Sequence, residues 1–275
     1  MRVLDLFSGI GGFSLGLERA GMKTVAFCEY DKHAQKVLRK HWPDVPIFED
    51  VRKLDGNQFR GSVDVVCGGF PCQDVSVAGK QAGFGGERSN LYTEMLRVIG
   101  ECRPKFAIFE NVSGLLTGDE GKWFGKFLYD LAEIGFDAEW HCISASYIGA
   151  PHHRDRVWIV AYPSSDNGYA SENEESGKRL NQSSFVDACE STSISSNADD
   201  QRRKGRGKKS VSRKLDLSIK LKRSIEDIRR GFDLSEPPLC GANDGVSGRA
   251  HRLKQLGNAV VPVIPEAIGR AIMSI

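Results

Sequence analysis

The residue best placed for covalent chemistry is Cys72, in the motif Gly-Gly-Phe-Pro-Cys-Gln directly after a predicted strand at 63–67. In parallel α/β folds ligands bind beyond the carboxyl ends of the strands, so a cysteine in such a loop is a candidate nucleophile. The alternative is a small buried thiol, the usual fate of a free cysteine. Cys28, Cys67 and Cys142 fit that alternative by their positions in predicted strands, and Cys72 does not.

A carboxyl group follows the next predicted strand along the chain. Glu110 stands in Glu-Asn-Val directly after a strand expected at 106–109, and it would project into the same crevice as Cys72. A carboxyl group beside a thiol can act as the acid that works with a nucleophile. An isolated Glu-Asn pair is also common in turns and helix caps, which is the simpler interpretation of this motif alone.

Two arginines precede a late strand expected at 157–162. Arg154 and Arg156 alternate along an extended segment and therefore share one face. Their guanidinium groups could hold a base edge, a phosphate or Glu110, and the alternative is an ordinary charged strand edge. The adjacent His152 and His153 would point to opposite faces, so we expect no metal site.

The glycine-rich segment Asp-Leu-Phe-Ser-Gly-Ile-Gly-Gly at 5–12 predicts a ligand-binding turn between a strand at 3–7 and a helix at 13–20. Glycines let a backbone approach a ligand, and a helix N-terminus offers free N–H groups. Glu29 closes the next strand, at 24–28, where an acid can accept hydrogen bonds from a ribose. The spacing differs from Gly-x-Gly-x-x-Gly, which favours a nucleoside-containing cofactor other than NAD; an ordinary turn is the alternative.

These motifs require a sheet whose strand ends lie together. Short apolar runs alternate with helix-like stretches, a pattern typical of a mostly parallel α/β sheet covered on both faces. Asp50, after a short strand at 46–48, could face a bound base or could be a turn residue. We also expect a strand at 141–145 paired with 157–162, and helices at 32–41, 91–100 and 265–275.

The composition limits the classes of protein to which this chain can belong. The chain has 275 residues, 40% of them hydrophobic and 27% charged, which fits a globular protein with a large core. We see no apolar run near the roughly 20 residues that cross a bilayer, and no signal peptide. Seven cysteines without paired spacing indicate reduced thiols rather than a disulfide framework.

The middle of the chain differs from its flanks. Residues 163–200 contain ten Ser and carry a net charge of −6, whereas residues 201–230 contain 13 basic and 3 acidic side chains. Such a composition favours a surface insertion that is partly disordered. The local positive charge would meet any polyanionic partner. We therefore expect a catalytic domain at 1–162, an inserted region at 163–248 and a return to the first domain at 249–275.

Taken together and in this order, the motifs resemble those of the DNA (cytosine-5)-methyltransferase family of bacteria and phages. The resemblance rests on the glycine-rich segment, Pro-Cys-Gln, Glu-Asn-Val, the Arg-x-Arg pair and Gly-Asn-Ala-Val at 257–260. It covers residues 1–162 and 249–275. It implies a Rossmann-like S-adenosylmethionine-dependent methyltransferase fold with a small, polar target-recognition insertion, and it implies methylation of carbon 5 of cytosine in DNA.

The resemblance also implies residue roles. Cys72 would attack carbon 6 of a flipped-out cytosine, Glu110 would hold nitrogen 3 and the exocyclic amine, and Arg156 would hold oxygen 2 with Arg154 in support. S-adenosyl-L-methionine would contact Phe7, Gly9, Gly11, Phe13, Glu29, Asp50, Val51, Pro71, Leu91 and Asn258. DNA would contact Gln73, Ser76, Lys80 and Gln81 in a mobile loop at 73–90, and Arg202, Arg203, Lys204, Arg206, Lys208 and Lys209 in the basic segment.

Two alternatives remain open at the level of sequence. A tRNA-modifying branch shares Pro-Cys and Glu-Asn-Val but carries Cys-Phe-Thr, and no cysteine here is followed by Phe. A catalytically silent DNA-binding protein would not need Cys72, Glu110 and Arg156 together. The family has Gln where His152 stands, a departure we expect to be tolerated. We expect a monomer in the cytoplasm that acts on double-stranded DNA; its partners could include a cognate restriction endonuclease.

Overall fold

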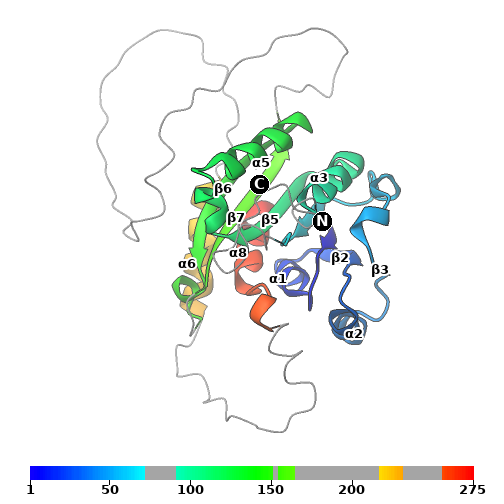
Figure 1. Ribbon diagram of the computed structural model, residues 1–275. Helices are drawn as coiled ribbons and strands as arrows, with labels where there is room; N and C mark the ends of the chain where they lie inside the picture. Colours follow the sequence, from blue (N-terminus) through cyan, green and yellow to red (C-terminus); the bar gives the residue numbers. More distant parts are fainter. Residues whose placement is uncertain (72–90, 151–153, 165–216, 232–255) are drawn as a thin grey trace, which may run out of the picture.

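The computed structural model describes residues 1–71, 91–150, 154–164, 217–231 and 256–275 (Figure 1). Several predicted features lie outside these residues: Cys72, the 73–90 loop with Gln73, Ser76, Lys80 and Gln81, the two histidines at 152 and 153, and the basic side chains Arg202, Arg203, Lys204, Arg206, Lys208 and Lys209. The expectation of partial disorder for 163–248 also falls mostly outside them.

A seven-stranded sheet with the order β3-β2-β1-β4-β5-β7-β6 forms the centre of the molecule. The strands from β3 to β5 are parallel, and β7 runs antiparallel to both β5 and β6. The predicted mostly parallel sheet is confirmed, as is the pairing of the two late strands, in which His141 lies opposite Trp158. The bounds are β1 (Arg2–Leu6), β2 (Lys23–Cys28), β3 (Ile47–Phe48), β4 (Val65–Gly68), β5 (Phe106–Val112), β6 (Phe136–Ser144) and β7 (Asp155–Pro163).

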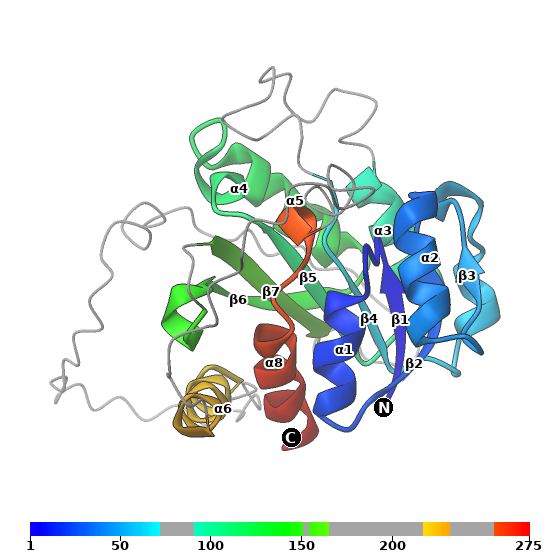
Figure 2. The same ribbon diagram turned by 90° about the horizontal axis from the view of Figure 1, so that it is seen from below.

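Helices cover both faces of the sheet, as alternating side chains require. Val65 packs into a core with α1, α6 and α8, which lie side by side in Figure 2, and Val66 packs into a second core with α3 and α5. The α-helices are α1 (Gly12–Arg19), α2 (Lys32–His41), α3 (Leu91–Cys102), α4 (Gly114–Thr117), α5 (Lys122–Glu133), α6 (Leu217–Gly231) and α8 (Val263–Met273). The sequence pattern did not predict α4, α5 or α6.

Small residues bring the C-terminal segment close to α1. A Cβ atom added at Gly16 would lie 2.1 Å from the carbonyl oxygen of Pro262, and one added at Gly12 would lie 2.6 Å from that of Val260. Neither distance is possible for a larger side chain without movement of the backbone. The two glycines therefore allow the segment before α8 to pack against the first turns of α1, next to the glycine-rich turn.

The segment at 256–273 differs from the expectation that no apolar run is long enough to cross a bilayer. Residues 256–273 have a mean hydropathy of 1.2 over 18 residues, so a segment that is long and apolar enough to cross a membrane does exist. Within it, α8 buries Ile264, Ile268 and Ile272 in the core that it shares with α1. The apolar side chains of α8 are therefore explained by their burial in the protein core.

Candidate active site

The carboxyl ends of β1, β2, β4 and β5 meet along one edge of the sheet. Parallel register places Leu6 beside Cys28 on one side and beside Gly68 on the other, and Gly68 beside Phe109. The segments that leave these strands are the ones that carry the sequence motifs. The edge therefore brings the glycine-rich turn, Glu29, residues 68–71 and Glu110 into one region, while Cys72 lies outside the described residues.

Glu29 ties the glycine-rich turn to the end of β2. One carboxylate oxygen accepts a hydrogen bond from the Gly9 N–H at 2.7 Å and the other accepts from the Asp31 N–H at 2.6 Å. Burial raises the pKa of the Glu29 carboxyl, while these two hydrogen bonds oppose the rise. A Cβ atom at Gly9 would meet nothing within 4 Å, so the space above the turn is open to a ligand.

Asp5 supports the same turn through hydrogen bonds with Ser14 in the helix that follows it. Its Oδ2 accepts hydrogen bonds from the Ser14 hydroxyl at 2.7 Å and from the Ser14 N–H at 3.3 Å, which satisfies a donor in the first turn of α1. Gly11, the N-cap residue, has a φ of 87° and no side chain with which to cap the helix. Burial raises the pKa of Asp5 to about 7, so this carboxyl is partly protonated at neutral pH.

The other predicted cofactor residues divide into two groups. Phe7, half-buried with a φ of 53°, and Pro71, Leu91 and Asn258 lie at the edge of the sheet or on segments beside it. Phe13 lies apart from them, because its ring is buried in the core at 5.5 Å from the Trp158 ring. The structure thus places Phe13 behind the turn, where it can support the pocket without lining it.

The segment at Asp50 and Val51 is held by arginines. Both carboxylate oxygens of Asp50 accept hydrogen bonds from Arg52, and Arg52 lowers the pKa of Asp50. The Val51 carbonyl accepts a hydrogen bond from Arg97 at 2.8 Å, and Arg97 also binds the Leu54 carbonyl at 3.0 Å. The sequence analysis missed Arg97, because its neighbours Glu94 and Glu101 on α3 indicate only intrahelical ion pairs.

Trp42 is a second residue that the sequence analysis missed. Its indole N–H donates to the Glu18 carboxylate at 2.9 Å, and its ring fills the space in which a Gly11 side chain would otherwise lie. The ring therefore fixes the glycine-rich turn from the side of α2. A tryptophan at the end of a helix carries no sequence signal for this contact.

Glu110 and the two arginines form a buried ionic cluster. Arg156 Nε lies 2.9 Å from Glu110 Oε1, and Arg154 Nη2 lies 4.0 Å from the same oxygen. Glu110 lies inside β5 rather than after it, a correction to the predicted strand end, because β7 pairs with β5 as far as Val112. Burial raises the pKa of Glu110, and the two guanidinium groups oppose the rise.

The residues just before Cys72 are anchored beside this cluster. The Phe70 ring stacks on Phe127 at 5.7 Å, and the Asn111 side chain donates to the Phe70 carbonyl at 3.2 Å. A Cβ atom at Gly69 would lie 3.0 Å from Glu110 Oε2, so glycine lets the chain pass close to the carboxylate. The chain is therefore held beside Glu110 as far as Phe70, which precedes Cys72 by two residues in the sequence.

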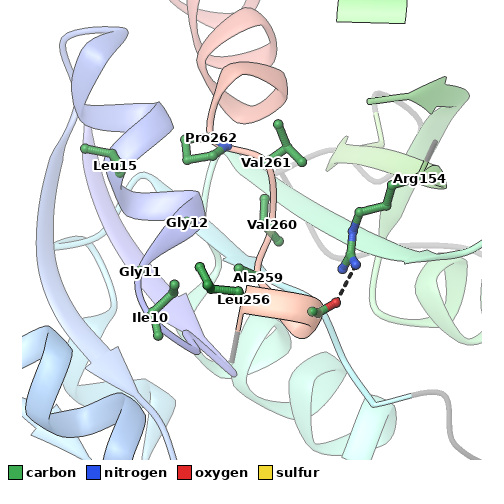
Figure 3. Close-up of a pocket in the computed structure, with 11 residues that line it drawn as sticks. Ile10, Gly11, Gly12, Leu15, Arg154, Leu256, Ala259, Val260, Val261 and Pro262 are labelled. Carbon is green, nitrogen blue, oxygen red and sulfur yellow. Dashed lines mark hydrogen bonds between the residues drawn. The ribbon is translucent and has the colours of Figure 1, made fainter. Parts of the chain in front are cut away.

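A cavity of about 660 Å³ lies between the glycine-rich turn and the segment that leads into α8 (Figure 3). Backbone atoms of Gly11 and Gly12 form one wall, Ala259 and Val260 form another, and Arg154 closes the side nearest Glu110. Asn258 is exposed on the same segment. Among the residues that the structure describes, no three His, Cys, Asp or Glu side chains come together as metal ligands would.

The family and the proteins to which this chain is similar are DNA methylases and methyltransferases. A family model described as C-5 cytosine-specific DNA methylase matches residues 1–231. The type II methyltransferase M.Eco47II of Escherichia coli is 42% identical over 161 residues, which cover 58% of this chain and 39% of that protein. The type II methyltransferase M.PspPI of Psychrobacter is 39% identical over 160 residues, which cover 58% of this chain and 38% of that protein.

Among solved structures, a candidate DNA modification methyltransferase encoded within an E. coli prophage superimposes with a TM-score of 0.60 at 21% identity. The match covers 100% of this chain and 99% of that one, which supports the Rossmann-like methyltransferase fold. The chain spans about two fifths of the length of the curated relatives it matches. Because the family model covers most of its length, this chain belongs to the C-5 cytosine-specific DNA methylase family.

Proposed function

We propose that this chain methylates carbon 5 of cytosine in a specific double-stranded DNA sequence, through a covalent adduct between Cys72 and a flipped-out base. The observation that carries the proposal is the cluster of Glu110, Arg156 and Arg154 beside the anchored start of the Pro-Cys segment. Nitrogen 3 and oxygen 2 are adjacent on one edge of cytosine. A carboxyl and a guanidinium group 2.9 Å apart match that edge.

The residues at the sheet edge fit S-adenosyl-L-methionine as the cofactor. The open space above Gly9, the half-buried Glu29 carboxylate at the end of β2 and the cavity wall formed by Gly11 suit a nucleoside and an amino acid chain. We assign the pocket to Phe7, Gly9, Gly11, Glu29, Asp50, Val51, Pro71, Leu91 and Asn258, with Phe13 behind it. The bound cofactor supplies an electrophilic methyl group on a sulfonium centre.

The chain's own groups then carry the reaction on the base. The Cys72 thiolate adds to carbon 6, and the electron pair moves toward carbon 5 while Glu110 donates a proton or hydrogen bond to nitrogen 3. Carbon 5 becomes nucleophilic and would take the methyl group from the sulfonium centre, whose sulfur would keep the electron pair of the broken bond as a thioether. Solvent water takes the carbon 5 proton, the bond between carbon 6 and sulfur breaks to release the Cys72 thiolate, and nitrogen 3 returns its proton to Glu110, which restores the aromatic ring. A thiolate suits both steps because it is a good nucleophile and a good leaving group.

The environment of Glu110 supports its role as the donor. A carboxyl group must be protonated to donate to nitrogen 3, and burial raises the pKa of Glu110 above its ordinary value, which favours the protonated form. Arg156 is ion-paired with the same carboxyl and could bind oxygen 2 without leaving it. Arg154 supports Arg156 in this arrangement.

The substrate must be opened before this chemistry can occur. A cytosine inside a duplex is inaccessible, so the base is flipped out at a cost of a few kcal/mol. We assign backbone and loop contacts with DNA to Gln73, Ser76, Lys80, Gln81 and the basic side chains at 202–209, and target recognition to 163–248. The reaction would take place in the cytoplasm of a bacterial or phage-infected cell, as part of a restriction–modification pair or as an orphan activity.

Covalent trapping tests this proposal. Duplex DNA amplified with 5-fluoro-dCTP in place of dCTP offers every sequence context and blocks loss of the carbon 5 substituent. With S-adenosylmethionine present, we expect a denaturant-resistant protein–DNA adduct with the wild type and none with Cys72→Ala. An adduct with Cys72→Ala would overturn the nucleophile assignment. No adduct with the wild type, despite DNA binding, would favour a silent DNA-binding protein.

A further inference from the structure

Arg154 contacts two elements that belong to different parts of the proposed site. Its Nη2 lies 4.0 Å from Glu110 Oε1 on β5, and its Nη1 donates to the carbonyl oxygen of Gly257 at 2.5 Å, the dashed line in Figure 3. Only 17% of the Arg154 side chain is exposed. The guanidinium group therefore spans the gap between the base-binding cluster and the segment before α8.

Arg156 differs from Arg154 although it occupies the same strand face. Its Nε contacts Glu110 and its Nη1 donates to the carbonyl of Asp155, within its own strand. Among the described residues, Arg156 makes no hydrogen bond or ion pair with the segment at 256–259. The two arginines form a natural pair for comparison, because they share the Glu110 contact and differ in the Gly257 contact.

Gly257 lies next to Asn258, two residues before Ala259 and three before Val260, and Ala259 and Val260 form a cavity wall opposite the glycine-rich turn. Within the part of the chain that the structure describes, the bond from Arg154 is the one hydrogen bond that joins residues 256–259 to another element. Leu256, Gly257 and Asn258 are themselves exposed, so packing contributes little to fixing them. Arg154 is therefore the side chain that ties them to the rest of the described structure.

We propose that Arg154 is a positioning residue for the cofactor: it holds the 256–259 segment against the glycine-rich turn while it faces Glu110. The inference rests on the proposed function, because it concerns the S-adenosylmethionine pocket of that site. The planar guanidinium fork can serve two partners at once, which a single ammonium group cannot do as well. Loss of Arg154 should loosen the cofactor pocket, and loss of Arg156 should not.

Isothermal titration of the full chain with S-adenosylhomocysteine, without DNA, tests this inference. We expect Arg154→Met to raise the Kd about tenfold, the effect of one hydrogen bond to a charged group. Arg154→Lys keeps charge and one donor, so we expect a smaller rise of about threefold. Arg156→Met and Arg156→Lys should stay within about twofold of the wild type. Thermal unfolding of each ligand-free variant shows that it is folded.

The outcomes separate the inference from the proposed function. Equal Kd values for the Arg154 and Arg156 variants, with tight binding by the wild type, would overturn the inference and leave the proposed function standing. No binding by the folded wild type would overturn the cofactor assignment and the inference with it. If Arg154→Met does not fold, the comparison of Arg154→Lys with Arg156→Lys decides the question in the same way.

Discussion

Arg156 and Glu110 are joined across two antiparallel strands, with Nε 2.9 Å from Oε1, although Arg156 lies opposite Val112 in the register. Side chains two positions apart on paired strands share a face, so the pairing of β5 with β7 places them together. The base-binding cluster is therefore built into the sheet.

The first prediction concerns Glu110. We expect Glu110→Gln to slow methyl transfer by about 10²- to 10⁴-fold, because an amide cannot deliver a proton to nitrogen 3. The Kd for S-adenosylhomocysteine should stay unchanged, since Glu110 lies outside the cofactor pocket. Single-turnover methylation and titration of the same preparation measure the two effects. A variant with a rate within threefold of the wild type would show that Glu110 is not the donor.

The second prediction concerns Asp5 and pH. Its pKa is about 7 in the folded protein against 3.8 ordinarily, because burial disfavours the charged form. Such a carboxyl stabilises the fold below its ordinary pKa, and that stability is lost as the pH rises through the folded pKa. We expect the free energy of unfolding to fall by about 2 kcal/mol between pH 5 and pH 7.

Asp5→Asn provides the comparison, because the amide is uncharged throughout this range. Urea unfolding at the two pH values should show a smaller pH dependence for this variant than for the wild type. Glu29 and Glu110 also have raised pKa values and contribute to both proteins equally. The same pH dependence in both proteins would contradict the assignment to Asp5.

The third prediction compares two glycines in helices. Gly16→Ala would place a Cβ atom 2.1 Å from the Pro262 carbonyl oxygen, so we expect the free energy of unfolding to drop by about 2 kcal/mol. Gly125 in α5 has nothing within 4 Å of an added Cβ, so Gly125→Ala should stabilise by about 0.5 to 1 kcal/mol. Urea unfolding measures both. A neutral Gly16→Ala would show that α1 and the segment before α8 are not closely packed.

The fourth prediction concerns DNA affinity and salt. Because we assign the basic side chains at 202–209 to phosphate contacts, the logarithm of the DNA-binding constant should fall steeply with the logarithm of salt concentration. Replacing these six side chains with Gln should reduce that slope and weaken binding to all sequences alike. Fluorescence anisotropy with two unrelated duplexes at several salt concentrations checks it. A slope unchanged by the replacement would place the segment outside the interface.

Much of the sheet could be predicted from the sequence, because short apolar runs bounded by Gly, Pro and Asp mark buried parallel strands. The helix at 32–41 was predicted with its observed bounds, since Asp31 caps it. Three helices were missed: α4 spans only four residues, and α5 and α6 were missed for different reasons. In α5 the aromatic residues Phe124 and Phe127 were not recognised as a helical face, and in α6 the apolar positions gave no single period.

The candidate site could be predicted as a set of motifs but not as a set of contacts. The meeting of Glu29 with Gly9 follows from strand ends that the sequence indicates, whereas that of Glu110 with Arg156 follows from the antiparallel pairing of β5 with β7. The roles of Trp42 and Arg97 depend on contacts between distant segments, which no local pattern carries. Phe13 was assigned by its place in a motif, whereas the direction of its side chain depends on how α1 packs.

Bisulfite sequencing of plasmid DNA from cells that express the wild type or Cys72→Ser tests the central claim most directly. We predict protected cytosines in one short recurring sequence context with the wild type, and none with Cys72→Ser. That result would establish the reaction and its target sequence together. No protected cytosines with a folded wild type that binds S-adenosylmethionine would contradict the claim that this chain methylates cytosine in DNA.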